Sequence, residues 1–155
     1  MVDVQPALMR DVLAIRQWRN EASVRWSSGN RAAIGLGEHL RWFWRARSSA
    51  RYEILIGVET DGSRVGTVQY REDYSGVWVV SVAVAPSRRG DGYGTALLTQ
   101  GEAWLCGRHT VKGLIARVRP ENAISLHVFG NCGFSRGERD SSGFERLVKY
   151  FGEQP

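Results

Sequence analysis

The stretch from Val79 to Trp104 constrains the fold more than any other part of the chain. It opens with the apolar, largely β-branched run 79–84, which predicts a buried strand. Pro86 ends that strand because proline has no N–H to donate. The glycine-rich segment 88–94 then leads into Thr95–Leu98, where good helix formers stand at helical spacing. A strand, a glycine-rich turn and a helix N-terminus in this order favour a site for a phosphorylated anion, since backbone N–H groups can approach the ligand there.

The spacing of the glycines distinguishes between phosphate-binding motifs. A P-loop has the pattern G-x-x-x-x-G-K-[ST], and no lysine followed by serine or threonine stands here. A dinucleotide fingerprint has the pattern G-x-G-x-x-G, whereas Gly90, Gly92 and Gly94 are spaced G-x-G-x-G. Residues 89–94 instead fit [Q/R]-x-x-G-x-[G/A], which resembles the pyrophosphate loop of the GNAT superfamily of N-acetyltransferases. A turn that merely connects a strand to a helix is the alternative for this pattern alone.

This resemblance implies acetyl-CoA as the cosubstrate. By analogy with the family, the N–H groups of residues 89–95 hold the pyrophosphate, and the side chain of Arg88 or Arg89 adds positive charge. The family's central strand and the next strand splay apart, and the pantetheine arm lies along the exposed strand, here Val82–Val84, whose backbone groups it satisfies. The cofactor-binding residues implied in this way are Val82, Val84, Arg88, Arg89, Gly90, Gly92, Tyr93, Gly94, Thr95, Asn122 and Ser125.

The length of 155 residues predicts one domain, spanning 1–155, with a single sizeable core. No apolar run approaches the length of a membrane span, and the first residues do not have the pattern of a signal peptide. Cys106 and Cys132 are too few for a disulfide framework, and no Cys/His spacing suggests a metal site. We therefore expect a cytoplasmic protein without a membrane segment or a metal.

The net charge of +5 comes mostly from arginine, because Lys112 and Lys149 are the only lysines among 21 basic residues. Arginine is suited to bidentate phosphate contacts. The basic residues are spread along the chain without a run, which is typical of a solvated surface and does not predict nucleic-acid binding. A nucleotide-bearing substrate and the cofactor phosphates would account for the same excess of positive charge.

The periodicity of the chain predicts an alternation of strands and helices without repeats or linkers. The segment 21–37 is rich in Ser, Gly and Asn and predicts a loop with at most one helical turn. The order of elements matches the GNAT fold, an α/β domain with a mixed, mostly antiparallel central sheet flanked by helices and with splayed central strands. Strands are expected at 2–5, 52–59, 65–71, 79–84, 114–118, 133–136 and 144–151, and helices at 10–20, 38–50, 92–106 and 120–131. The expected apolar faces are Val12, Ile15, Trp18 and Arg19 on the first helix, and Leu40, Phe43, Trp44 and Arg47 on the second, with His39 and Trp42 beside them.

A second match covers NAISLHVFGNCGF, residues 122–134, which resembles the family's N-x-x-[A/S]-x-x-x-Y-x-x-x-G-F segment. Phe129 stands where the family usually has tyrosine, whose hydroxyl is its common general acid. Since Phe129 has no proton to give, solvent could protonate the departing thiolate, or His127 or Cys132 could do so. Loss of catalysis, leaving an acetyl-CoA-binding sensor, is the other consequence that this departure allows.

The general base that removes a proton from the attacking amine is not evident from the sequence. Many family members carry a glutamate on the central strand, but no carboxylate stands between Val77 and Ala85. The candidates are His39, Ser81 and the acidic pair Glu72 and Asp73, and a chain of ordered waters without a dedicated base is an equal alternative. A backbone N–H near Val82 is expected to stabilise the oxyanion.

The N-terminal half resembles a narrower group. Trp18-Arg19-Asn20, Val24-Arg25 and Glu38–Phe43 are similar to the W-R-N…V-R…H-x-x-W-F pattern of acetyltransferases that act on nucleotide-linked amino sugars, such as the pseudaminic acid pathway enzyme. This implies N-acetylation of a primary amine on such a sugar by direct attack on the thioester. A protein N-terminus, a polyamine or an antibiotic amine are alternative acceptors. The apolar tail 147–151 could pair two copies in a homodimer, although a core strand explains it as well.

Overall fold

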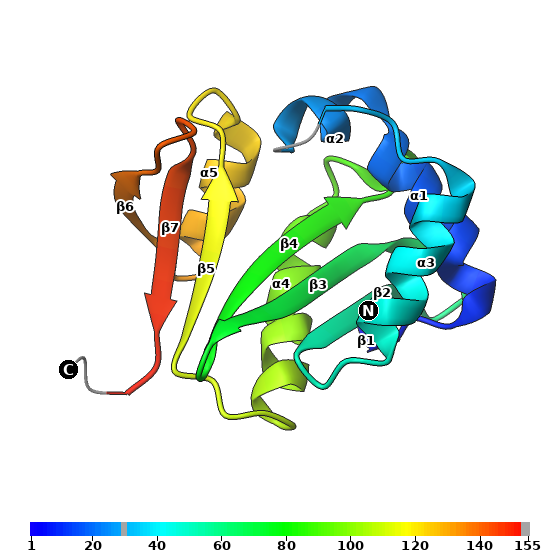
Figure 1. Cartoon of the computed structure of the whole chain (residues 1–155), viewed down its shortest axis with the longest axis horizontal. Helices are drawn as coiled ribbons and strands as arrows, with labels where there is room; N and C mark the ends of the chain where they lie inside the picture. Colours follow the sequence, from blue (N-terminus) through cyan, green and yellow to red (C-terminus); the bar gives the residue numbers. More distant parts are fainter. Residues whose placement is uncertain (29–30, 153–155) are drawn as a thin grey trace.

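A computed structural model describes residues 1–28 and 31–152, and these form one seven-stranded sheet with helices on both faces (Figure 1). The strand order is β1-β2-β3-β4-β5-β7-β6. Neighbouring strands are antiparallel except β4 and β5, which are parallel. The strands are β1 (Val2–Pro6), β2 (Tyr52–Glu59), β3 (Arg64–Tyr74), β4 (Val77–Val84), β5 (Gly113–Val118), β6 (Ser135–Arg139) and β7 (Glu145–Tyr150).

The helices divide between the two faces of the sheet, and each face buries its own apolar cluster. On one face, Ile15 and Phe43 pack with Ile54 and Ile56 of β2. On the other face, Leu97 and Leu105 pack with Val68, Tyr70 and Val80 of the central strands. The first face carries α1 (Val12–Asn20), α2 (Ala22–Ser27) and α3 (Leu36–Arg47). The second face carries α4 (Tyr93–Cys106), and α5 (Ala123–Asn131) follows β5 in the chain. Short 3-10 turns occupy Met9–Asp11 and Pro86–Arg88.

The parallel pair β4 and β5 separates part-way along its length, as the family resemblance implied. Only three registers join the two strands, from Val77↔Gly113 to Val79↔Ile115. Beyond Val79, β4 pairs with β3 alone, through registers that continue to Gly66↔Val84. Figure 1 shows the two arrows diverging towards their C-terminal ends. The fold is therefore the α/β arrangement with splayed central strands that was expected.

The N-terminal helices differ from expectation in two respects. The segment expected to be a loop contains the six-residue helix α2, which begins where the Glu21 side chain accepts a hydrogen bond from the backbone N–H of Ser23. On α3 the fully buried positions are His39, Phe43 and Ala46, whereas Trp44 is 55% exposed. The side of α3 that faces the core is therefore rotated relative to the predicted side. On α1 the expected face is confirmed, since Val12, Ile15 and Trp18 are buried.

The C-terminal tail lies inside the sheet. β7 pairs with β5 on one side and with β6 on the other, so its backbone has neighbours on both edges. The explanation of this segment as a core strand is supported for residues 147–150, whereas a homodimer stays a prediction. No helix within residues 1–28 and 31–152 is both long and apolar enough to cross a membrane.

Candidate active site

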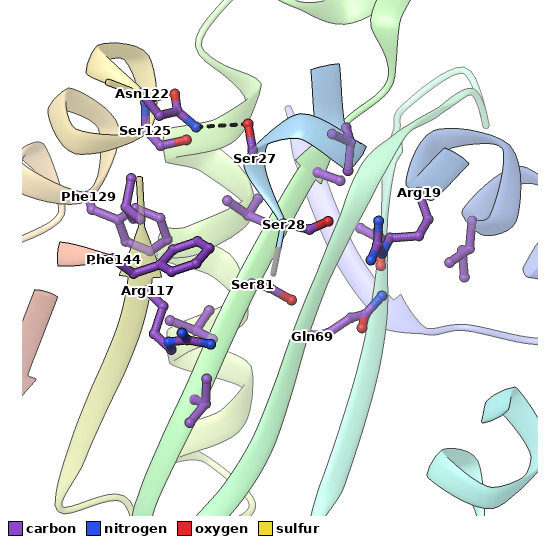
Figure 2. Close-up of a pocket in the computed structure, with 18 residues that line it drawn as sticks. Arg19, Ser27, Ser28, Gln69, Ser81, Arg117, Asn122, Ser125, Phe129 and Phe144 are labelled. Atoms are coloured by element: carbon purple, nitrogen blue, oxygen red, sulfur yellow. Dashed lines mark hydrogen bonds between the residues drawn. The ribbon is translucent and has the colours of Figure 1, made fainter. Parts of the chain in front are cut away.

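A pocket of about 330 Å³ opens where β4 and β5 part (Figure 2). Its walls come from segments far apart in the chain, namely α1 and α2 on one side and β5 and α5 on the other, with β3 and β4 between them. The lining residues are Ile15, Arg19, Val24, Ser27, Ser28, Thr67, Gln69, Val79, Val80, Ser81, Val82, Ala83, Arg117, Val118, Asn122, Ser125, Phe129 and Phe144.

The middle of the pocket is built by β3 and β4. Ser81 and Gln69 are register partners on these strands, and both line the pocket together with Thr67. Thr67 directs its hydroxyl to the Leu55 carbonyl at 2.8 Å, which fixes its side chain within the sheet. Because β5 no longer pairs with β4 here, backbone groups of residues 80–84 face the gap. Val82 is half-buried and lines the pocket, so the strand predicted to be exposed to the pantetheine arm does border the cavity.

The glycine-rich turn leaves open space at the N-terminus of α4. Gly90 and Gly92 have φ of 86° and 81°, a region that side-chain-bearing residues avoid. A Cβ built on either residue would meet no atom within 4 Å, so the space beside the backbone of this turn is open. Gly94 and Thr95 follow in the first turn of α4, where helix N–H groups have no carbonyl partner within the helix. This geometry fits a pyrophosphate group, which needs close N–H donors.

Both arginines of the turn contact other protein groups. Arg88 donates to the Ser63 hydroxyl at 2.8 Å and lies over the Tyr93 ring at 5.9 Å. Arg89 donates to the Ser23 hydroxyl and the Glu21 carboxylate, each at 3.0 Å. Tyr93 donates its hydroxyl to Glu59, and this hydrogen bond raises the pKa of the tyrosine. The Arg89 contacts join the predicted cofactor loop to the start of α2.

Asn122 organises the opposite wall. Its side-chain oxygen accepts from the Ser125 backbone N–H at 3.2 Å and so caps α5, while its amide nitrogen donates to the Ser27 hydroxyl at 3.2 Å. Arg119 adds two hydrogen bonds to α2 and its end, to the carbonyls of Trp26 at 2.6 Å and Ser28 at 3.1 Å. α2 is therefore held from both sides, by Arg89 at its first residues and by this wall at its last.

The structure brings Phe129 to the pocket and leaves the two substitute acids outside it. Phe129 is 4% exposed and packs edge-on against Phe134, with ring centroids 5.0 Å apart. His127 is exposed on α5 and interacts with Asn131, and the Cys132 thiol, whose pKa is raised by burial, does not line the pocket. Neither side chain is placed to protonate a thiolate there.

Among the predicted bases, only Ser81 lines the pocket. His39 is 1% exposed, and its Nε2 atom contacts the Val12 carbonyl at 2.9 Å, so its ring is a buried link between α3 and α1. Glu72 accepts from the Gly76 backbone N–H at 3.0 Å and pairs with Arg51, while Asp73 pairs with Arg71 at 3.3 Å. The assignments of His39 and Glu72 as catalytic residues are therefore not supported, because the fold uses these side chains elsewhere.

Several lining residues have no counterpart in the sequence prediction. Ser27 and Ser28 lie at the end of the unpredicted helix α2, and Arg117 and Phe144 come from β5 and the turn before β7. No local motif marks them. The alternation of Thr67 and Gln69 on β3 is the one available signal, since polar residues two apart on a central strand share one face.

The comparisons agree with this geometry. The sequence matches the acetyltransferase (GNAT) family over residues 12–134. This span is more than half of the chain, and the protein belongs to that family. A comparison with curated proteins gives no match.

Solved structures share the fold at low sequence identity. Spermidine N-acetyltransferase from Vibrio cholerae, in complex with CoA and spermine, is 12% identical with a TM-score of 0.86, covering 96% of this chain and 95% of that one. Phosphinothricin acetyltransferase from Sinorhizobium meliloti, in complex with AcCoA, is 15% identical with a TM-score of 0.84, covering 97% and 89%. Aminoglycoside acetyltransferase AAC(6')-Ib, in complex with coenzyme A, is 17% identical with a TM-score of 0.80, covering 97% and 95%.

Proposed function

We propose that this protein transfers the acetyl group of acetyl-CoA to the primary amine of a small molecule, and that the acceptor is a nucleotide-linked amino sugar. The observation that carries the transfer reaction is the parting of β4 and β5 beside the open N-terminus of α4. Backbone groups of Val82 and Val84 would hold the pantetheine amides, and the N–H groups of residues 90–95 would hold the pyrophosphate. Family membership and the CoA complexes of the structural neighbours support the choice of cosubstrate.

The reaction requires positioning more than dedicated acid or base groups. The amine nitrogen forms a bond to the acetyl carbonyl carbon, the carbon–sulfur bond breaks, and CoA leaves as a thiolate. Since no His, Asp or Glu is among the described pocket-lining residues, we propose that water accepts the amine proton. A thiol has a pKa of about 8.5, so its thiolate is an adequate leaving group and can take its proton from solvent. Phe129 is therefore compatible with catalysis.

The amino-sugar assignment rests on the W-R-N…V-R…H-x-x-W-F pattern and on the size of the pocket. Arg19 of that pattern lines the pocket, whereas His39 of the same pattern lies in the core. A pocket of about 330 Å³ suits a substrate whose sugar enters while its remaining groups extend to solvent.

The test is turnover of acetyl-CoA, followed as free thiol, against UDP- and TDP-linked 4-amino sugars. A tripeptide, spermine and kanamycin serve as alternative acceptors. Turnover confined to the sugar nucleotides would support the whole proposal. Turnover with only the peptide, spermine or kanamycin would overturn the assignment of the acceptor as a sugar nucleotide. It would leave the proposed acetyl transfer standing.

A non-catalytic sensor is the second candidate, favoured by Phe129 at the position of the usual tyrosine. Calorimetric binding of acetyl-CoA together with no thiol release on any amine would select the sensor and reject the transferase.

A further inference from the structure

The pocket has an unbalanced set of charges. Its described lining contains two ionisable side chains, Arg19 and Arg117, and no carboxylate. They lie on opposite walls, with Ser81 and Gln69 between them, as Figure 2 shows. A polyamine or aminoglycoside acceptor carries several ammonium groups and requires acidic partners, which this lining does not supply.

Arg117 is held in place by two neighbouring side chains. Its Nε atom donates to Asp140 at 2.6 Å, and its guanidinium lies over the Phe144 ring at 4.5 Å. Asp140 is fixed in turn, because it accepts from the backbone N–H groups of Ser142 at 2.9 Å and Phe144 at 3.1 Å. A guanidinium has five N–H donors, and using Nε for Asp140 leaves the η nitrogens available to an acceptor in the pocket.

The charge around Phe144 is positive even with Asp140 counted. Arg119 lies over the same ring at 4.6 Å, so two guanidinium groups accompany one carboxylate at this wall. Arg119 itself is occupied with the Trp26 and Ser28 carbonyls, which accept hydrogen bonds but do not neutralise charge. The wall therefore keeps about one net positive charge next to the cavity.

Arg19, on α1, lies at the opposite wall of the pocket. It is half-buried, and burial lowers its pKa because the charged guanidinium loses part of its hydration. An anion placed against a partly desolvated guanidinium interacts with it more strongly than it would in open water.

We infer that Arg19 and Arg117 together bind an anionic group of the acceptor, a phosphate or a carboxylate, so that the substrates of this enzyme are amines that also carry negative charge. The inference rests on the proposed function and narrows it, since it concerns the acceptor half of the same pocket. The diphosphate of a sugar nucleotide is one source of such a group, and the carboxylate of an amino acid is another. Both have oxygens that match a guanidinium in bidentate geometry.

The test compares matched pairs of amines that differ in one anionic group. A UDP-linked 4-amino sugar against the free 4-amino sugar tests phosphate, and an amino acid against its amide tests carboxylate. We expect kcat/KM to be at least about tenfold higher for the anionic member of one pair, mainly through a lower KM, and spermine to be a poor acceptor. The pair that shows the preference identifies the source of the anion.

Arg117→Gln is the decisive variant because the side chain lies at the pocket rim, where its loss leaves the core intact. We expect it to lower the ratio of kcat/KM for the anionic member to kcat/KM for the neutral member by about 10- to 100-fold, which corresponds to the loss of one charge-assisted hydrogen bond. Its dissociation constant for acetyl-CoA should be unchanged. Arg108→Gln, which removes an equal charge at the far end of α4, is the matched control and should behave as wild type.

Three results would overturn the inference. The first is equal use of both members of each pair by the wild-type enzyme, and the second is efficient acetylation of spermine. The third is an equal decrease in kcat/KM for anionic and neutral amines in Arg117→Gln, which would indicate that Arg117 has a general structural role. In all three cases acetyl transfer itself would stand. If none of the amines caused thiol release, this result would instead overturn the proposed function, and the inference with it.

Discussion

Lys149 joins three elements of the fold, and replacing it with methionine tests how far this junction stabilises the domain. Its ammonium donates to the two Glu102 carboxylate oxygens at 2.8 and 2.7 Å and to the Cys132 carbonyl at 2.9 Å. It thereby links β7 to α4 and to the end of α5. The side chains of Lys149 and Glu102 are 25% and 21% exposed, so the pair is mostly withdrawn from water.

The expected decrease in the free energy of unfolding follows from this burial. Breaking a fully buried pair costs about 3–5 kcal/mol because one charge is left uncompensated, whereas an exposed pair contributes about 0.2–1 kcal/mol. For a pair that is mostly buried we expect Lys149→Met to lower the free energy of unfolding by about 2–3 kcal/mol. Glu102 would then lose its ammonium partner near the buried Tyr70 hydroxyl, which has no hydrogen-bond partner within the described residues.

Equilibrium unfolding in urea of a double-mutant cycle measures the effect. Glu102→Gln removes the charge that Lys149→Met leaves behind, so the double variant should be more stable than the sum of the single losses by at least about 1 kcal/mol. Arg71→Met is the matched control, because Arg71 pairs with Asp73 on the surface, and it should cost less than about 1 kcal/mol. A loss below about 0.5 kcal/mol in Lys149→Met, or strict additivity in the cycle, would refute the reasoning.

Three further predictions concern single side chains. Burial lowers the pKa of His39 and outweighs the opposing effect of its contact with Val12, so below a pH of about 6.5 the unfolded chain binds the extra proton. The free energy of unfolding should therefore fall from pH 7.5 to pH 5.5 more steeply in wild type than in His39→Gln, and parallel curves from urea titrations would contradict this. Glu21→Gln releases Arg89 from an exposed ion pair, so the calorimetric dissociation constant for acetyl-CoA should fall by up to about fivefold, and weaker binding would count against Arg89 as a pyrophosphate ligand. Phe129→Tyr should change kcat by less than about threefold, because the thiolate leaves without an acid, and a tenfold gain would show that its protonation limits the rate.

Patterns that repeat over one element predicted most of the architecture. The apolar run before Pro86, the glycine spacing after it and the Asn122–Phe134 segment each combine residue types whose conformational preferences agree. Strand β2 has the predicted bounds, and the core strands follow their β-branched runs closely. The sequence allowed one helical turn between residues 21 and 37 but did not place α2, because six residues are too few to establish a helical period and its start depends on a side-chain cap from Glu21.

The buried face of α3 shows where periodicity becomes insufficient. His39 and Trp44 both stand among apolar residues at helical spacing, and only the position of β2 and α1 decides that the histidine is buried and the tryptophan exposed. A polar ring can be buried when a carbonyl is placed to meet it, and the Val12 carbonyl is such a partner. The partner comes from 27 residues earlier in the chain, so no local pattern contains it.

The sequence by itself predicted the class of the fold, the glycine-rich turn before α4 and the phenylalanine at position 129, because each depends on neighbouring residues whose backbone preferences and chemistry are local. The tertiary structure alone decided which side chains share the pocket. Arg19, Ser81 and Arg117 lie on three different elements, and they meet because β5 leaves β4 after Val79 and α2 crosses the opening. The charge of the pocket is a sum over residues that only folding brings together, and the proposed preference for an anionic acceptor depends on this sum.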